Sequence, residues 1–89
     1  MFDMHDAARR GVIRLGDSTD HGGQVKSAFD GLMALGRPVA GEGCVVWCPK
    51  CKGEFAILPA PSGRRHHGKT LAYDMDLTAC GARLLSSVA

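Results

Sequence analysis

The chain has 89 residues, of which 45% are hydrophobic and 6% aromatic, and its formal net charge is only +2 at pH 7. A chain of this size makes one domain and buries too little apolar surface to fold well without a metal, a disulfide or a partner. Its 11 basic and 9 acidic side chains are scattered, which argues against a concentrated basic face for nucleic acid. The 12 glycines and 4 prolines favour short strands and tight turns over a helical bundle.

Targeting segments are not evident in the sequence. Residues 1–10 lack the apolar core of a signal peptide, and no run in the chain is long enough to cross a membrane. We therefore expect a cytoplasmic origin without stable membrane anchoring, and we interpret residues 1–10 as an N-terminal arm before a β domain over residues 11–89. In a reducing compartment, cysteines indicate metal ligands or redox groups rather than disulfides. The chain has four of them, Cys44, Cys48, Cys51 and Cys80.

Short strands and glycine-rich turns are expected along the first half of the β domain. A first strand is predicted over residues 11–15, and a second over residues 24–29, where polar and apolar residues alternate. Residues 30–31 are an Asp-Gly turn signal. Residues 32–35 form either a strand or a single helical turn.

The second half continues in the same way. A turn at residues 48–53 precedes a strand candidate at residues 54–58, and the proline-rich residues 59–63 break regular structure. Residues 64–68 form a polar turn and residues 69–73 the next strand. The chain is therefore predicted to be all-β.

One short pattern occurs three times, as an apolar stretch that runs into a turn carrying a soft metal ligand. Each ligand lies eight residues after a small or apolar residue: His21 after Ile13, Cys48 after Ala40 and Cys80 after Ala72. Three hairpin-like units in so few residues predict a pseudo-threefold arrangement of β-hairpins. Short polar side chains also recur in these turns, where they commonly satisfy backbone groups. They are Asp17, Thr19, Asp76 and Thr78.

The cysteine spacing predicts a structural zinc site. Cys48 and Cys51 form a CxxC knuckle, whose two sulfurs can face one ion. Zinc takes four tetrahedral ligands of sulfur or imidazole nitrogen, and His21 and Cys80 occupy equivalent places in the other repeats. A site with four protein ligands has no open position for a substrate, which disfavours catalysis at the metal. We therefore expect a non-enzymatic protein with zinc held by His21, Cys48, Cys51 and Cys80.

Three other residues are rivals for a place among the ligands. Cys44 stands in the second repeat where Asp17 stands in the first, and we interpret it as a small buried hydrophobic residue. His66 and His67 follow two arginines in a proline- and glycine-rich connection, which favours a solvated turn.

The sequence resembles the PAAR-repeat proteins, which form the tip of the bacterial type VI secretion spike. The resemblance is carried by residues 16–23, by residues 36–40 with Cys48-Pro49, and by residues 78–82, and it spans about residues 9–87. It implies a small cone of β-hairpins with zinc near the vertex. It also implies a broad base that sits on the blunt end of a trimeric spike protein.

The resemblance therefore implies a mechanical function. A zinc-stabilised tip would cap the trimeric spike, one tip per trimer, and sharpen it for membrane penetration. It would stay in the cytoplasm before firing and be delivered to the extracellular space or a target cell, with an effector or adaptor as a further candidate partner. We expect Val12, Val39 and Leu71 to lie toward the base, within an exposed apolar docking face.

Two other classes of function remain open. A zinc-ribbon module that binds nucleic acid or a protein would use the four cysteines, but ribbons favour two knuckles and a basic face. A CxxC thiol oxidoreductase would place its first cysteine at the N-terminus of a helix, whereas residues 53–57 predict another strand.

Overall fold

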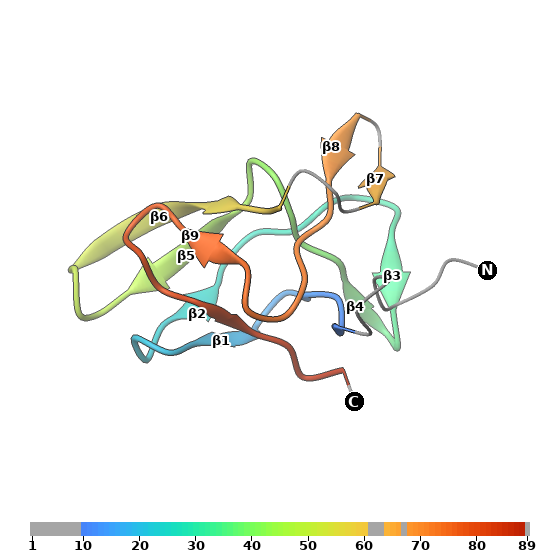
Figure 1. The fold of residues 1–89 in the computed structure, drawn as a ribbon. Helices are drawn as coiled ribbons and strands as arrows, with labels where there is room; N and C mark the ends of the chain where they lie inside the picture. The colour runs from blue at the N-terminus through green and yellow to red at the C-terminus, as the bar shows by residue number, and fades with distance from the viewer. Residues whose placement is uncertain (1–9, 61–63, 67, 89) are drawn as a thin grey trace.

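The computed structural model describes residues 10–60, 64–66 and 68–88, so most of the predicted N-terminal arm lies outside the described residues (Figure 1). The described residues form short strands and no helix, and the all-β prediction is confirmed. None of them forms a helix capable of spanning a membrane. The strands are β1 Ser18–Thr19, β2 Gln24–Val25, β3 Met33–Ala34, β4 Arg37–Pro38, β5 Val45–Cys48, β6 Gly53–Leu58, β7 Arg65–His66, β8 Lys69–Thr70, β9 Leu77–Thr78 and β10 Leu84–Leu85.

Six of these strands form one sheet that nearly closes on itself. The order is β10-β1-β2-β5-β6-β9, with antiparallel pairing between neighbours. A bridge between Leu77 in β9 and Arg83, the residue before β10, joins the two ends of this order. The ring consists of three hairpins, β1–β2, β5–β6 and β9–β10, and it leaves no long unpaired edge among the described strands.

Three chain segments cross next to this ring and hydrogen-bond to one another in a cycle. The Ile13 amide donates to the Ala72 carbonyl at 2.9 Å, Ala72 donates to Ala40 at 3.0 Å, and Ala40 donates to Ile13 at 2.8 Å. All three residues are fully buried. They are the residues from which the sequence repeats were aligned, so the cycle places a pseudo-threefold axis through the single chain.

The turn that follows each member of the cycle has the same geometry. An amide donates to the carbonyl three residues earlier at 3.0 Å, from Asp17 to Arg14, from Cys44 to Gly41 and from Asp76 to Tyr73. The third residue of each turn has a positive φ: 86° at Gly16, 85° at Gly43 and 72° at Met75. Glycine adopts this backbone region easily, whereas a residue with a Cβ is strained there. The third repeat therefore keeps the turn at a local conformational cost.

Two hydrophobic clusters fill the interior. The first lies inside the ring and consists of Ile13, Val25, Ala40, Cys44, Val46, Ile57, Ala72 and Leu84. The second consists of Val12, Ala34, Val39, Leu71 and Tyr73. The expectation that Val12, Val39 and Leu71 form an exposed apolar face is wrong, because all three are buried at 2% exposure or less. Packing within the second cluster covers these side chains inside the monomer, with the partly buried Phe29, Leu32 and Val88 against it.

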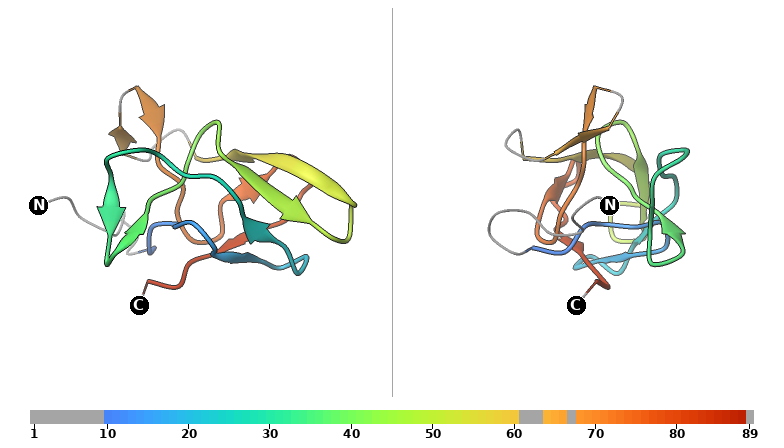
Figure 2. Two further views of the ribbon diagram at one scale, coloured as in Figure 1. Left: turned by 180° about the vertical axis from the view of Figure 1, so that it is seen from behind. Right: turned by 90° about the vertical axis from the view of Figure 1, so that its right-hand side faces the viewer.

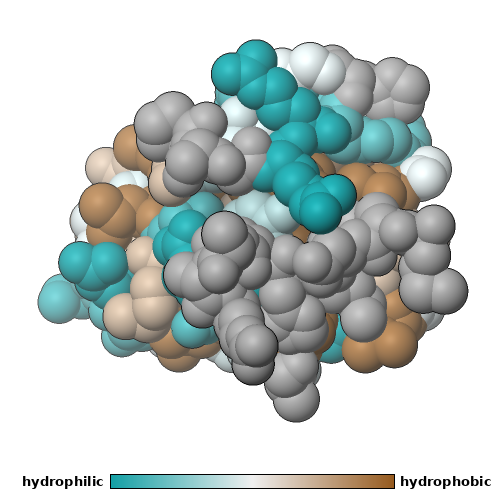
Figure 3. Space-filling view, turned by 45° about the vertical axis from the view of Figure 1, so that its right-hand side comes forward, coloured by the Kyte–Doolittle hydropathy of each residue, from teal (hydrophilic) through white to brown (hydrophobic). Residues whose placement is uncertain are grey.

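The two small hairpins β3–β4 and β7–β8 lie at the opposite end of the molecule from the ring turns (Figure 1). We call this the base end, and the end carrying residues 20–23, 49–52 and 79–82 the ligand end. Residues 32–35 thus contribute a strand rather than a helical turn, and Met33 and Leu35 are 52% and 71% exposed. Figure 2 shows both ends in two further views. On the face shown in Figure 3, hydrophilic side chains gather at the top and hydrophobic ones lie lower, on both sides.

Candidate metal centre

Two threonines brace the turns that carry His21 and Cys80. The Thr19 hydroxyl oxygen accepts the Gly23 amide at 3.0 Å and the His21 amide at 3.3 Å. At the equivalent place, Thr78 accepts the Ala82 amide at 3.2 Å. Both threonines are buried, which confirms the predicted role of these short polar side chains in the turns. The two turns are therefore fixed from inside the ring.

The turn between β5 and β6 is longer and carries two cysteines. The Cys51 amide donates to the Cys48 sulfur at 3.4 Å, which curls the CxxC segment around that sulfur. Lys52 then adopts a φ of 56°, and Gly53 begins β6. Cys48 is fully buried at the end of β5, whereas Cys51 is exposed on the turn. This hairpin thus offers one inner and one outer sulfur.

The three turns bring His21, Cys48, Cys51 and Cys80 together. One ligand atom from each of the four residues can be chosen so that all lie within 4.8 Å of one another. The His21 Nδ1 lies 3.7 Å from the Cys48 sulfur and 4.0 Å from the Cys80 sulfur. Tetrahedral zinc with ordinary bond lengths separates a nitrogen and a sulfur ligand by about 3.6 Å. The group can therefore hold a metal ion after small side-chain movements, and its soft nitrogen and sulfur donors suit zinc.

Hydrogen bonds shift the pKa values of Cys80 and Cys51 in opposite directions. Burial alone raises the pKa of the Cys80 thiol, but hydrogen bonds from Thr78 and the Ala82 amide lower this pKa to about 6. For Cys51, hydrogen bonding with Cys48, followed by desolvation and by Cys80, raises the pKa to about 11. Three adjacent thiols cannot all ionise cheaply, because like charges repel. A divalent cation would remove this conflict.

An acidic residue lies outside the cluster on the far side of the imidazole. The Asp20 carboxylate is 4.0 Å from the His21 Nε2, the ring nitrogen that does not face the sulfurs. The same carboxylate accepts the Arg83 amide at 2.9 Å, which ties the first turn to the third hairpin. Carboxylates in this position commonly orient a histidine ligand. Asp20 was not among the predicted site residues, and its only sequence signal is its place beside His21.

The rival ligands lie elsewhere. Cys44 is 5% exposed within the first hydrophobic cluster, which confirms its interpretation as a small buried residue. His66 lies in β7, where its Nε2 is 3.2 Å from the Asp30 carbonyl oxygen and its ring is 5.8 Å from the Phe29 ring. His67 lies outside the described residues. Among the described residues, the convergent group contains neither Cys44 nor His66.

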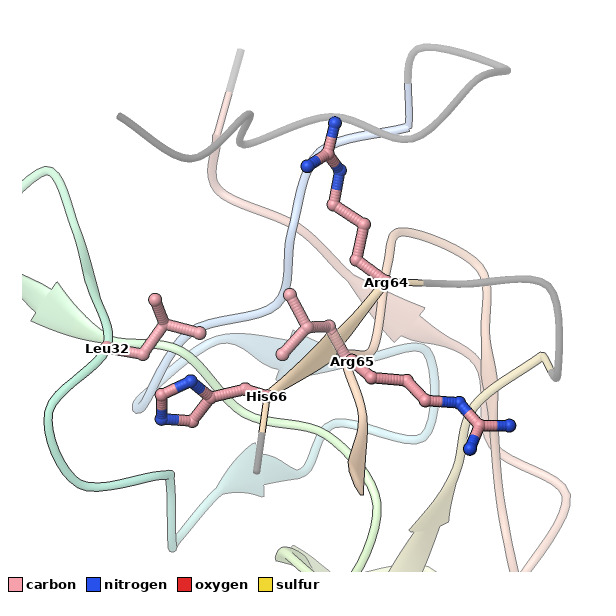
Figure 4. Close-up of a pocket in the computed structure, with 5 residues that line it drawn as sticks. Leu32, Arg64, Arg65 and His66 are labelled. Carbon is pink, nitrogen blue, oxygen red and sulfur yellow. The ribbon is translucent and has the colours of Figure 1, made fainter. Parts of the chain in front are cut away.

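A cavity of about 370 Å³ near the base end is lined by Leu32, Arg64, Arg65, His66 and Leu71. Figure 4 shows that the Arg64 and Arg65 side chains point in different directions, while Leu32 and His66 face each other. The two guanidinium groups therefore do not converge on one ligand. The cavity shares no residue with the metal-binding group.

A partly buried polar network supports the first repeat from the base side. The Ser87 hydroxyl donates to the Asp17 carboxylate at 2.6 Å and accepts the Arg14 guanidinium at 2.6 Å. Asp17 also accepts the Arg14 amide at 2.8 Å and contacts Arg37 at 3.4 Å. In the third repeat, Asp76 accepts the Tyr73 amide at 2.9 Å and pairs with Arg10 at 3.1 Å. Equivalent aspartates thus hold equivalent turns, although sequence reasoning did not identify their arginine and serine partners.

Residues 15–86 match the family model described as PAAR motif, which is most of the chain. No curated protein and no solved structure matches this sequence.

Proposed function

This chain belongs to the PAAR-motif family, and we propose that it is a zinc-stabilised tip that caps the trimeric spike of a type VI or similar contractile secretion machine. In this proposal, His21, Cys48, Cys51 and Cys80 hold one zinc ion, and the base end docks on the trimer. The tip sharpens the spike for membrane penetration and works without enzymatic chemistry.

The hydrogen-bond cycle of Ile13, Ala40 and Ala72 is the observation that carries this proposal. A single chain can meet three identical subunits equally only if it presents three similar units around one axis. The cycle, the three matching turns and the three ring hairpins supply such units. An enzyme or a nucleic-acid-binding module has no requirement for this internal symmetry.

Zinc would supply the stability that the narrow ring cannot. The turn tips at the ligand end contain small or polar residues rather than large apolar side chains, namely Gly22, Pro49, Lys50 and Gly81. Structural zinc contributes about 10–16 kcal/mol in small peptides, whereas whole domains have a stability of about 5–15 kcal/mol. The ion would therefore fix the relative positions of the three turns, and this stiffness is the role that we assign to it.

The base end offers apolar side chains to a partner. Met33 and Leu35 project from the β3–β4 hairpin and are 52% and 71% exposed. They lie at the opposite end from the metal-binding group, so a spike could contact them without touching the ligands (Figure 1). We propose residues 11–89 as the capping domain and residues 1–10 as an arm, which leaves the flanks of the ring for an effector or adaptor.

Delivery follows from this role. We propose that the protein is made and assembled in the cytoplasm and reaches the extracellular space or a target cell when the machine fires.

The alternative zinc-ribbon module needs Cys44 as a ligand, and the burial of Cys44 in the hydrophobic cluster speaks against it. A thioredoxin-like arrangement is also disfavoured, because the CxxC segment connects β5 to β6 rather than opening a helix.

Mixing the purified protein with a trimeric spike protein tests the proposal. Analytical ultracentrifugation should show one copy of this chain per trimer. Met33→Asp combined with Leu35→Asp should abolish the complex, because two charges would then enter an apolar contact. Leu58→Asp is the matched control, since Leu58 is 54% exposed on β6 in the ring and belongs to neither base hairpin. Failure to bind the cognate trimer, or equal loss of binding in the control, would contradict capping by the base end.

A further inference from the structure

Cys51 differs from the other three members of the metal-binding group. His21, Cys48 and Cys80 occupy the position eight residues after the hydrogen-bonded cycle, whereas Cys51 has no counterpart in the other repeats. Cys48 is fully buried, His21 and Cys80 are half-buried, and Cys51 is exposed. The group thus combines three ligands fixed by the repeat with one at the surface of a turn.

The outer sulfur has a neighbour suited to form a disulfide with it. Cys51 and Cys48 belong to one four-residue CxxC turn, and the amide of Cys51 already donates to the Cys48 sulfur at 3.4 Å. Their sulfurs lie within 4.8 Å of each other, and a disulfide requires a separation of about 2.05 Å. Movement within this turn can close that gap. Cys80 belongs to a different hairpin, so a disulfide between Cys51 and Cys80 would cross-link two hairpins, whereas one between Cys48 and Cys51 stays within one turn.

We propose that Cys51 is a site of reversible thiol modification by small organic disulfides, and that Cys48 completes the reaction by forming a Cys48–Cys51 disulfide that releases the metal. This inference rests on the proposed zinc site. It assigns a chemical reactivity to the ligand end that capping of a spike does not require.

The reaction proceeds in two exchange steps. The Cys51 sulfur, which is deprotonated when it serves as a zinc ligand, attacks one sulfur of the organic disulfide RSSR, which forms Cys51–S–S–R and expels RS⁻. The Cys48 thiolate then attacks the Cys51 sulfur, which forms the Cys48–Cys51 bond and expels a second RS⁻. Two electrons pass from the two cysteine thiolates to RSSR, and no other oxidant is needed. Small thiols reverse both steps.

Loss of the metal follows from ligand number. After the second step, Cys48 and Cys51 no longer supply thiolates, and only His21 and Cys80 remain. Two ligands do not complete the tetrahedral shell of a structural zinc site. The ion would therefore hold the turns of the ligand end together under reducing conditions, and its loss in an oxidising medium would release them.

The test uses zinc-loaded full-length protein and glutathione disulfide as the probe. Released zinc is followed with a chromophoric indicator, and modified peptides are mapped by mass spectrometry after quenching with acid. We expect a glutathione adduct on Cys51 first, then a Cys48–Cys51 disulfide, with zinc release in parallel. Cys51→Ser should slow release by about tenfold or more, because the accessible thiolate is missing. Cys44→Ser is the matched control and should release zinc at the wild-type rate.

The outcomes separate this inference from the proposed function. If the purified protein binds no zinc, the zinc site itself is wrong. If it binds one zinc ion but the first adduct lies on Cys48 or Cys80, or the final cross-link joins Cys51 to Cys80, the inference is overturned and the zinc site stands. Adduct mapping on the wild-type protein decides the matter even if Cys51→Ser does not fold.

Discussion

The His21 Nδ1 lies 3.7 Å from the Cys48 sulfur, although 27 positions separate the two residues in the chain. Each stands at the turn of its own hairpin, eight residues after a member of the hydrogen-bonded cycle. The contact at the ligand end is therefore a consequence of the backbone symmetry deeper in the molecule. Substitutions in the two regions should have different effects.

Removal of one predicted ligand should weaken metal binding, whereas removal of the rival cysteine, Cys44, should not. We expect Cys80→Ala to lower zinc affinity by more than about 100-fold, since changes outside the ligand shell already reach that range. The melting temperature should fall with it. Cys44→Ala should keep one zinc per chain, because Cys44 lies in the hydrophobic cluster. Elemental analysis measures the zinc content per chain, and competition with a chelator measures the zinc affinity. Loss of zinc in Cys44→Ala together with retention in Cys80→Ala would show that the ligand set is wrong.

Removal of the metal should loosen the ligand end before the rest of the fold. A ligand at about 1,000 times its Kd contributes about 4 kcal/mol, and each kcal/mol shifts the Tm of a domain of this size by about 4–8 °C. Chelation should therefore lower the Tm by about 15–30 °C. Trp47, which directly precedes Cys48 and is 41% exposed, gives a fluorescence signal from this end. Its signal should change at a lower temperature than the far-UV circular dichroism. As a control, added zinc should restore the Tm. An unchanged Tm after chelation would show that the metal does not contribute to stability.

Acidification should release the metal. Zinc binds thiolate sulfur and neutral imidazole, so protons compete with it and the affinity falls as the pH falls. We expect zinc occupancy, and the stability that depends on it, to decline between about pH 7 and pH 5. Thermal melts of zinc-loaded and chelated protein across this range provide the measurement. The difference between the two melting temperatures should shrink at low pH, and a constant difference would argue against a site built from thiolates and imidazole.

Replacement of Met75 by glycine should raise the stability of the protein. Gly16 and Gly43 occupy the same turn position in the other repeats, and Met75 adopts a φ of 72° there while its side chain is 43% exposed. The left-handed region costs about 1–2 kcal/mol for a residue with a Cβ, and glycine loses about 0.5–1 kcal/mol of chain entropy. We expect Met75→Gly to gain about 0.5–1 kcal/mol in chemical denaturation. Met75→Ala keeps the Cβ and should gain nothing. A loss of stability in Met75→Gly would show that the methionine side chain contributes more than its backbone costs.

Stability should be far more sensitive to substitution of the buried Asp17 than to substitution of an exposed aspartate. Its side chain is fully buried and accepts the Arg14 amide at 2.8 Å and the Ser87 hydroxyl at 2.6 Å. Asp17→Asn would remove the charge that pairs with the Arg37 guanidinium, and we expect a loss of about 2–4 kcal/mol in urea unfolding. The exposed Asp30→Asn should change stability by less than about 0.5 kcal/mol. Equal effects would show that the network with Arg14 and Ser87 contributes little.

The sequence by itself determined the features that repeat. Ile13, Ala40 and Ala72 could be matched because each begins the same order of apolar residue, turn and ligand, and the structure hydrogen-bonds these three residues in a cycle. The convergence of His21, Cys48 and Cys80 follows from the same order, and the CxxC spacing adds Cys51 to the group. Local signals suffice here because glycine turns and the CxxC spacing act within a few residues of the chain.

Only the tertiary structure decided which surfaces the repeats cover. Val12, Val39 and Leu71 look like candidates for an exposed face, but packing in the second hydrophobic cluster buries them. Ser87 is separated from Asp17 by 70 positions, and no local pattern indicates their contact. Burial and long-range hydrogen bonding depend on how distant segments pack, and a chain pattern with a period of a few residues contains no information about that packing.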